Sequence, residues 1–212
     1  MIMRKKKNVL VAGANGSTGR IIIDLLKKSG EYQPIAMVRK QEQKEHFEKE
    51  NVAAVLADLE EDLSNVFKNV DKAIFAAGSK GKNVEGVDQE GAKKFTDAAK
   101  NAGVEKFVML SSMGADNPSI SEDLEDYLEA KGNADEYLRK SGLDYTIVRP
   151  GALTNEEGSG KILLKEKLEE QESISRANVA RTLVEVLDND VKHNQVFEIL
   201  DGKTPIEKAV RS

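Results

Sequence analysis

The sequence predicts an α/β fold in which a doubly wound parallel sheet lies between two layers of helices. Three observations support this fold class. Short apolar runs alternate with segments of helical length along the 212 residues. The apolar runs contain few polar residues, as strands buried on both faces do. No linker or low-complexity stretch interrupts the alternation, so we expect a single three-layer domain over residues 1–212.

The individual elements follow from this alternation. Each expected strand is a short apolar run between turn-forming or charged residues. The expected strands are residues 8–12, 34–38, 52–56, 72–77, 106–110, 144–148 and 195–200. The expected helices are residues 20–28, 42–50, 63–67, 87–102, 122–141 and 178–187, with Gly142 ending the fifth and Ser175 capping the last. Such sheets bind ligands beyond the carboxyl ends of their strands, so functional residues are expected there.

The first strand leads into a glycine-rich turn, Gly13-Ala14-Asn15-Gly16-Ser17-Thr18-Gly19, and then into a helix. In this arrangement, backbone N–H groups and the helix N-terminus hold a diphosphate. The first glycine permits the tight turn, the second leaves room for the diphosphate, and the third allows the helix to pack closely on the strand. The sequence therefore predicts a dinucleotide site, with a simple tight turn as the alternative. Its expected cofactor-binding residues are Gly13, Asn15, Gly16, Ser17, Thr18 and Gly19.

Basic residues stand where the second strand ends. An NAD site carries an acidic residue about 20 positions after the glycines, which binds the ribose 2′-hydroxyl. Arg39 occupies that position here, and Lys40 follows it. A guanidinium beside an ammonium suits a 2′-phosphate, so the sequence favours NADP over NAD. An ordinary exposed basic pair is the alternative.

Three further strand ends are candidates for contacts with the cofactor. Asp58, followed by Leu59, is placed to accept a hydrogen bond from the adenine, or else to cap a helix. Small residues at the end of the fourth strand would let a ribose lie against the backbone, unless they form a plain loop. The proline and glycine after the sixth strand predict a turn beside the nicotinamide. These last two groups are Ala76, Ala77 and Gly78, and Pro150, Gly151, Ala152 and Leu153.

A candidate reaction centre follows the fifth strand. That strand ends in Ser111-Ser112, and the next helix carries Tyr127 and Lys131 at positions i and i+4, on one face. An ammonium group there would bind the nicotinamide ribose and favour the phenolate form of the tyrosine, which helps a phenol act as acid or base. A serine hydroxyl at the strand end would bind a substrate carbonyl. The spacing alone is common by chance, and its location supports the interpretation.

Composition excludes several other classes of protein. The formal net charge of −5 argues against general nucleic-acid binding. The absence of cysteine excludes disulfides and thiolate metal sites, and His46 and His193 lie far apart, so we expect no metal site and interpret both as surface residues. The apolar run after the basic start Arg4–Lys7 is too short for a signal peptide, and no segment approaches a membrane span. We therefore expect a cytoplasmic protein.

Together these motifs resemble the short-chain dehydrogenase/reductase superfamily, and most closely its atypical NAD(P)-binding, NAD-dependent epimerase/dehydratase-like branch. The segments that carry the resemblance are Gly13-x-x-Gly16-x-x-Gly19, Leu110-Ser111-Ser112, Tyr127-x-x-x-Lys131, residues 141–151 and residues 197–202. The resemblance implies a Rossmann fold, a bound nicotinamide dinucleotide and a catalytic group made of Ser112, Tyr127 and Lys131. Asp88 stands where the family's catalytic tetrad has asparagine.

The chain departs from full-length sugar epimerases after Gly151, where only a short C-terminal region (about 151–212) is left for the substrate side. We expect residues 154–173 to form a solvated helix, with a small lid as the alternative. The function expected from the sequence is an NADP-dependent oxidoreductase that transfers a hydride to a small carbonyl-type substrate. The alternatives are a non-catalytic NADP-binding sensor and a flavin or quinone reductase. We expect no nucleic-acid or membrane partner, and the choice between monomer and homodimer stays open.

Overall fold

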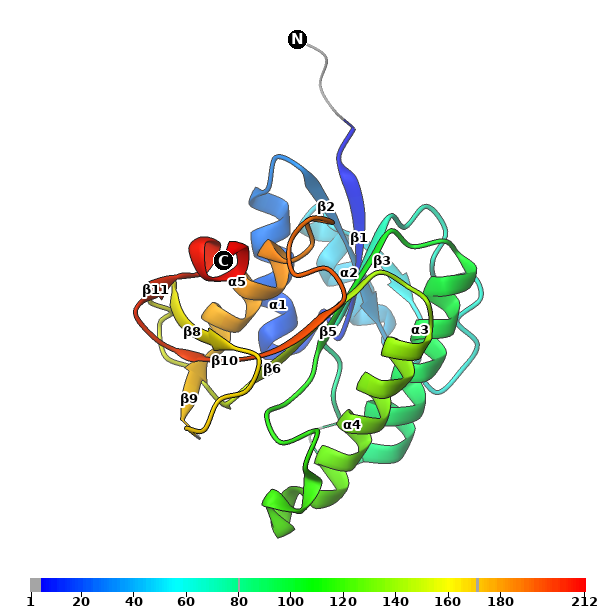
Figure 1. Cartoon of the computed structure of the whole chain (residues 1–212). Coiled ribbons are helices and arrows are strands. Elements are labelled where there is room, and N and C mark those ends of the chain that lie inside the picture. Colours follow the sequence, from blue (N-terminus) through cyan, green and yellow to red (C-terminus); the bar gives the residue numbers. More distant parts are fainter. Residues whose placement is uncertain (1–4, 80, 171) are drawn as a thin grey trace.

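Nine strands form the main sheet of the computed structural model, which describes residues 5–79, 81–170 and 172–212 (Figure 1). Arg4 of the basic start lies outside the described residues. The parallel strands run in the order β3-β2-β1-β4-β5-β6-β10. They are β1 (Lys7–Ala12), β2 (Tyr32–Val38), β3 (Ala53–Leu56), β4 (Lys72–Phe75), β5 (Lys106–Leu110), β6 (Tyr145–Pro150) and β10 (Gln195–Asp201). This order confirms the predicted fold class, a Rossmann-type α/β sheet.

Helices cover both faces of this sheet (Figure 1). One face carries α1 (Ser17–Lys28), α2 (Gln41–Lys49), α5 (Arg176–Glu185) and α6 (Ile206–Arg211). The other face carries η1 (Val84–Gly91), α3 (Ala92–Asn101) and α4 (Glu125–Lys140). The described residues include no helix that is both long and apolar enough to cross a membrane.

The two helical layers have separate apolar cores because side chains alternate along each strand. In β1, Val9 and Val11 belong to the core under α1 and α5, whereas Leu10 and Ala12 belong to the core under α3 and α4. All four side chains are fully buried. A strand buried on both faces must be continuously apolar, which is the pattern that predicted it.

The order of the strands reverses between β1 and β4. β1 pairs with β2 on one side and with β4 on the other, so the helices after β1 and β4 lie on opposite faces of the sheet. A crevice forms at such a switch point, at the carboxyl ends of the strands. The glycine turn follows β1 at this point.

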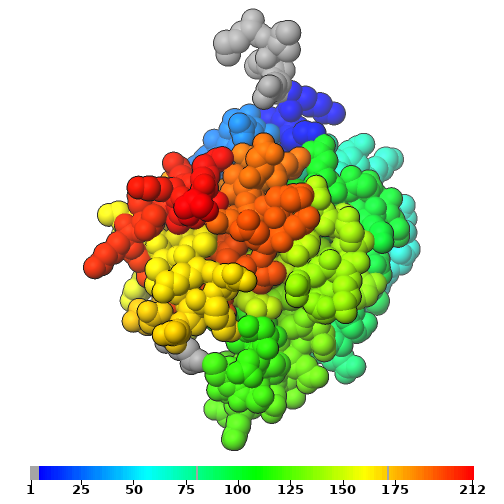
Figure 2. Space-filling model, viewed as in Figure 1, coloured from blue at the N-terminus to red at the C-terminus, as the bar shows by residue number. Residues whose placement is uncertain are grey.

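The C-terminal region adds strands that the sequence analysis did not predict. β8 (Lys161–Lys165) pairs antiparallel with β10, and β11 (Thr204–Pro205) pairs antiparallel with β8. β7 (Ala152–Thr154) and β9 (Ser173–Ser175) form a separate pair. Figure 2 shows this region, in yellow to red, covering one side of the visible face above the projecting green segment that follows β5.

The solvated helix expected over residues 154–173 is therefore wrong. The run Ile162-Leu163-Leu164 pairs with β10, the last of the parallel strands, and Ile162 is fully buried against it. This apolar run is short and has charged residues on both sides, so the sequence does not show the period of a strand. Its partner strand is also distant in sequence.

Other differences affect the ends of helices. Turns over residues 64–69 replace the short helix expected over 63–67, and the helix expected over 87–102 begins as the π-helical η1 before it continues as α3. The helix expected from 122 begins with two 3₁₀ turns, η2 (Pro118–Ile120) and η3 (Glu122–Leu124), ahead of α4. Ser175 caps α5 as expected, since its side chain accepts a hydrogen bond from the Asn178 N–H at 3.2 Å.

Two lysines are buried near the amino ends of β4 and β5. Lys72 and Lys106 occupy paired positions of these strands. The Lys72 ammonium donates to the Leu187 carbonyl at 2.8 Å and to the side chain of Asn189, and Lys106 donates to the Val191 carbonyl at 3.2 Å. These bonds hold the chain that follows α5. Burial, together with the neighbouring charge of Lys72, lowers the pKa of Lys106 to about 8.

This depressed pKa makes the effect of Lys106 on stability depend on pH. The unfolded chain has the higher proton affinity at this site, so the destabilising cost is full at pH 7 and declines as pH rises through 8 towards 10.5. We expect the stability of wild type relative to Lys106→Met to improve by about 2–3 kcal/mol between pH 7 and pH 10. Urea unfolding at both pH values tests this, with Lys203→Met at an exposed site as the control. A difference that does not change with pH would contradict it.

Candidate functional site

The glycine turn packs tightly between β4 and α1. Gly13 has a φ of +80°, and the Gly16 N–H donates to its carbonyl at 2.9 Å. A Cβ atom on Gly13 would lie 2.5 Å from the Ala76 carbonyl oxygen, and one on Gly19 would lie 2.1 Å from the Gly13 carbonyl oxygen. Only glycine fits at these two positions.

The N-terminus of α1 is left open towards this turn. Gly16 is the N-cap residue, and no side chain among the described residues caps the helix. The first turn of α1 carries no acidic residue. The first N–H groups of a helix have no partner within the helix, and the helix dipole makes this end positive. Ser17, Thr18 and Gly19 supply those N–H groups. The turn therefore fits a dinucleotide diphosphate.

Arg39 and Lys40 lie exposed between β2 and α2. Their backbone N–H groups both donate to the Gln43 side chain at 3.3 Å, and the Lys40 ammonium lies 3.6 Å from Glu42. Among the described residues, the Arg39 guanidinium has no hydrogen-bond or ion-pair partner. Its charge is therefore available to a ligand at the end of β2.

The candidates after β3 have different environments. The Asp58 carboxylate accepts a hydrogen bond from the Glu60 N–H at 3.1 Å, so it caps a turn and not a helix. The Leu59 side chain is buried in the core against Gly91, which leaves only its backbone for a cofactor.

The candidates after β4 and β6 also differ from each other. Ala76 and Ala77 are half-buried beside the glycine turn, and Gly78 is exposed. The turn expected at Pro150–Gly151 is wrong, because β6 continues through Pro150 and leads into β7, which contains Ala152 and Leu153. A Cβ atom on Gly151 would lie 2.2 Å from the Glu172 carbonyl oxygen, so close packing of the chain explains this glycine.

The candidate reaction centre contains a buried ion pair. The Lys131 ammonium lies 3.4 Å from the Asp88 carboxylate, and the two side chains are 4% and 0% exposed. Lys131 also lies 3.5 Å from the Leu110 carbonyl and 5.6 Å from the centroid of the Tyr127 ring. The other oxygen of the Asp88 carboxylate accepts a hydrogen bond from the Ser79 N–H at 2.9 Å. The pair connects η1, the end of β4 and α4.

A local feature of the chain places Asp88 there. The Asn83 side chain accepts a hydrogen bond from the Gly86 N–H at 3.1 Å and so begins η1. Asp88 lies within this π-helical segment, and π-helical turns are frequent at functional sites. The segment ends where α3 begins.

Ser112 stands apart from these residues in the contacts of the described chain. Its hydroxyl donates to the Met113 carbonyl at 3.1 Å. Ser111 is buried and donates to Asp135 of α4 at 2.8 Å. The structure therefore brings Tyr127, Lys131 and Asp88 together, and it places Ser112 at the carboxyl end of β5 as the sequence predicted.

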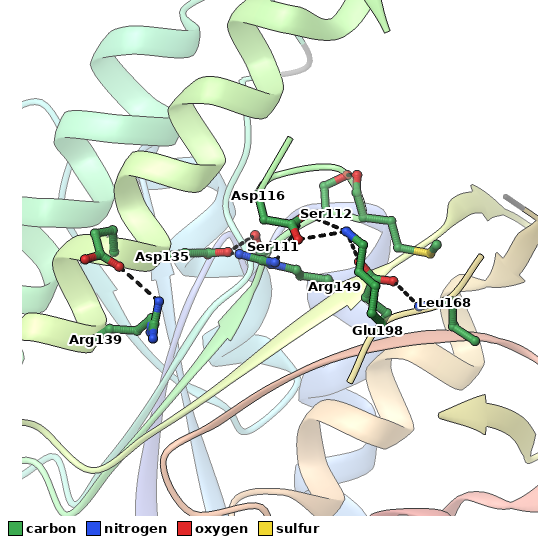
Figure 3. Close-up of polar contacts among 11 residues, drawn as sticks. Ser111, Ser112, Asp116, Asp135, Arg139, Arg149, Leu168 and Glu198 are labelled. Carbon is green, nitrogen blue, oxygen red and sulfur yellow. Dashed lines mark hydrogen bonds and ion pairs between the residues drawn. The ribbon is translucent and has the colours of Figure 1, made fainter. Parts of the chain in front are cut away.

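Beyond Ser111, a row of charged side chains joins the end of β5 to the C-terminal region (Figure 3). Arg149 of β6 donates to Asp135 at 2.9 Å and lies 3.5 Å from Asp116. Lys167 lies 2.7 Å from Asp116 and 3.3 Å from Glu198 of β10, whose other oxygen accepts from the Leu168 N–H at 2.7 Å.

This row of charges borders a groove of about 300 Å³ between α4 and the loop after β5, which Ala115, Asp116, Asp135 and Arg149 help to line. Burial raises the pKa of Asp135, and the charge of Arg149 opposes that rise. The pKa of Asp116 is lowered: burial acts against this, but the hydrogen bond from Lys167 and the charge of Arg149 outweigh it.

Sequence reasoning did not single out these network residues. Two of them could have been found from the sequence. Asp135 lies one turn after Lys131 on the same helix, and Glu198 is a charged residue within an apolar strand. Their partners, Asp116 and Lys167, are exposed loop residues without such a signal.

Comparison with known proteins places this site in a family. A family model described as NAD(P)H-binding matches residues 13–190. A Bacillus subtilis (strain 168) protein named as the uncharacterized sugar epimerase YhfK is 40% identical over 211 residues, which cover 96% of this chain and 98% of that protein.

Two solved structures agree with this assignment. A Bacillus halodurans protein provisionally named an NAD-dependent epimerase/dehydratase has a TM-score of 0.92 and 40% identity, covering 97% of this chain and 99% of that one. The oxidoreductase ylbE from Lactococcus lactis has a TM-score of 0.87 and 35% identity, covering 96% of this chain and 95% of that one. The chain therefore belongs to the NAD(P)H-binding family of epimerase/dehydratase-like Rossmann proteins.

Proposed function

We propose that the protein is an NADP-dependent oxidoreductase that transfers a hydride to a small carbonyl-type substrate. The observation that carries this proposal is the buried Lys131 ammonium, which faces both the Asp88 carboxylate and the Tyr127 ring beside the carboxyl ends of β4 and β5. A buried charge is costly and is kept where it is paired and used. The names of the relatives, an epimerase, an epimerase/dehydratase and an oxidoreductase, are consistent with nicotinamide chemistry.

Residues at three strand ends would hold the cofactor. The open N-terminus of α1 and the turn from Gly13 to Gly19 fit the diphosphate. The unpaired guanidinium of Arg39 supports NADP over NAD, because a 2′-phosphate offers it two charge-assisted hydrogen bonds. The backbone of residues 76–78 and 150–153 and the Asp58 carboxylate complete the proposed site.

The side chains of the candidate reaction centre would supply the proton and stabilise the group that donates it. Bound nicotinamide supplies the hydride. The Tyr127 hydroxyl gives its proton to the substrate oxygen, and the Lys131 charge favours the resulting phenolate. The Ser112 hydroxyl donates a hydrogen bond to the same oxygen. Asp88 positions Lys131 through the buried ion pair.

A second candidate is a flavin or quinone reductase that needs no acidic tyrosine. The Lys131 ammonium lies 5.6 Å from the centroid of the Tyr127 ring, which is a cation–π arrangement. Among the described residues, the Tyr127 hydroxyl has no hydrogen-bond partner. A tyrosine that only stabilises the Lys131 ammonium through its ring, and donates no proton, would make the same contacts.

Replacing Tyr127 by phenylalanine distinguishes these functions. We expect Tyr127→Phe to lower kcat for NADPH-dependent carbonyl reduction by about 10²–10⁴-fold, because the proton donor is lost. The measurement is NADPH oxidation across a panel of carbonyls, quinones and flavins, with calorimetry of NADPH and NADH binding. Tyr137→Phe on the same helix is the matched control, since the Tyr137 hydroxyl donates to Asp97 at the surface.

The possible outcomes distinguish the candidate functions. Carbonyl reduction at the wild-type rate in Tyr127→Phe would exclude the proton-donor role. Quinone or flavin reduction that does not depend on Tyr127 would support the second candidate. Tight NADPH binding with no turnover on any member of the panel would instead support a sensor.

A further inference from the structure

We propose that Arg20 is a second guanidinium for the 2′-phosphate of NADP, and that Asn15 and His46 position it. This inference rests on the proposed NADP dependence. Arg20 directly follows Gly19 and lies exposed in α1, close to the open end of that helix. Arg39 approaches the same cofactor from the end of β2.

The Arg20 guanidinium is held from three sides. One terminal nitrogen donates to the Asn15 side chain in the glycine turn at 2.5 Å. The other lies 3.0 Å from Nε2 of His46 in α2. The central carbon lies 5.4 Å from the centroid of the buried Phe47 ring. The planar group therefore bridges the glycine turn and α2, the helix that begins just after Arg39 and Lys40.

These contacts leave the charge of Arg20 unneutralised. Asn15, His46 and Phe47 provide no carboxylate, and the described residues give Arg20 no ion pair. In contrast, four other guanidiniums of the described chain form ion pairs with acidic side chains. They are Arg139 with Glu136, Arg149 with Asp135, Arg181 with Glu207 and Arg211 with Asp188.

Arg20 also keeps hydrogen-bond donors available. A guanidinium has five N–H groups in a rigid plane, and the contacts with Asn15 and His46 use two of them. A planar group already fixed in orientation loses little entropy when it binds an oxyanion. Arg20 is therefore a preorganised donor for a phosphate dianion beside the glycine turn.

His46 is one of the side chains that hold Arg20 in this position. Its Nε2 atom lies 3.0 Å from Arg20 and 3.1 Å from the Glu50 carboxylate. Nε2 accepts from Arg20 only when it carries no proton, and it donates to Glu50 only when it carries one. The two contacts therefore exclude each other. The Glu50 carboxylate also lies 3.7 Å from the Lys27 ammonium of α1, which gives it an ion-pair partner besides His46.

The experiment is calorimetry of the full chain with NADPH, NADH and adenosine 2′,5′-bisphosphate. We expect Arg20→Gln to lower the affinity for NADPH and for the bisphosphate by roughly 10-fold or more. The affinity for NADH should fall by less than about 2-fold, because NADH lacks the 2′-phosphate to which the lost hydrogen bonds go. His46→Leu should weaken NADPH by a smaller factor, and His46→Gln, which keeps an acceptor, should bind NADPH nearly as wild type does. Arg181→Gln on α5 is the exposed control.

The outcomes separate this inference from the function on which it rests. A wild-type protein with no preference for NADPH over NADH overturns the proposed NADP dependence. A wild-type preference that Arg20→Gln leaves unchanged overturns the role of Arg20 alone. Equal weakening of NADPH and NADH also overturns it, because Arg20 would then only support the glycine turn. A His46→Gln variant as weak as His46→Leu overturns the positioning role of His46.

Discussion

Gly19→Ala is expected to weaken the binding of NADPH by roughly 100-fold or more and to destabilise the protein. The new Cβ atom would lie 2.1 Å from the Gly13 carbonyl oxygen and 2.9 Å from the Ala14 Cα, both backbone atoms that cannot rotate away. The helix must therefore move away from β1, and the N–H groups at its start move with it. Losing two charge-assisted hydrogen bonds to a diphosphate costs about 3 kcal/mol or more, which is roughly 100-fold in affinity.

Calorimetry and urea unfolding measure the two effects of Gly19→Ala. We expect the free energy of unfolding to fall by about 1–3 kcal/mol, as for other overpacked sites. Gly30→Ala is the matched control, because a Cβ atom there has nothing within 4 Å. NADPH binding of wild-type strength in Gly19→Ala would show that the dinucleotide lies elsewhere.

The parallel half of the fold was predictable because its signal is local. A strand covered on both faces must be apolar at every position, so β5 appears in the sequence with the bounds that the structure has. The antiparallel strand β8 was not predictable in this way. Only Ile162 is fully buried there, and the strand exists because the edge of β10 offers it a partner.

The candidate site divides along the same line. The glycine turn follows from the glycine spacing in one βα unit, Arg39 from its distance to that turn, and Tyr127 and Lys131 from their place on the helix after the fifth strand. The partner of Lys131 does not, because Asp88 reaches it from another segment through a π-helical turn that no periodicity indicates. The contact between Arg20 and His46 was also not predictable, because these residues come from different segments of the chain. Both residues are exposed, as the sequence predicted for His46, and they meet only because α1 and α2 share one face of the sheet.

The buried pair of Asp88 and Lys131 gives the second large expected effect. Lys131→Met removes the only cation within ion-pair distance of Asp88 among the described residues, and the carboxylate is 0% exposed. Its remaining bond comes from the Ser79 N–H, which does not neutralise a charge. Breaking a buried ion pair from one side costs about 3–5 kcal/mol, so we expect a loss of that size in the free energy of unfolding. Lys93→Met is the control, because the pair of Lys93 with Glu90 lies at the surface and should contribute within about 1 kcal/mol.

A double variant separates stability from function at this site. Adding Asp88→Asn to Lys131→Met removes the uncompensated charge, so urea unfolding should show that most of the lost stability returns. The turnover of the double variant should stay low, because the ammonium proposed to assist Tyr127 is still absent. If turnover returned together with stability, Lys131 would act only as the counterion of Asp88. If Lys131→Met were as stable as wild type, the ion pair would contribute nothing to the fold, and the cost of keeping a lysine buried there would have to be explained by function alone.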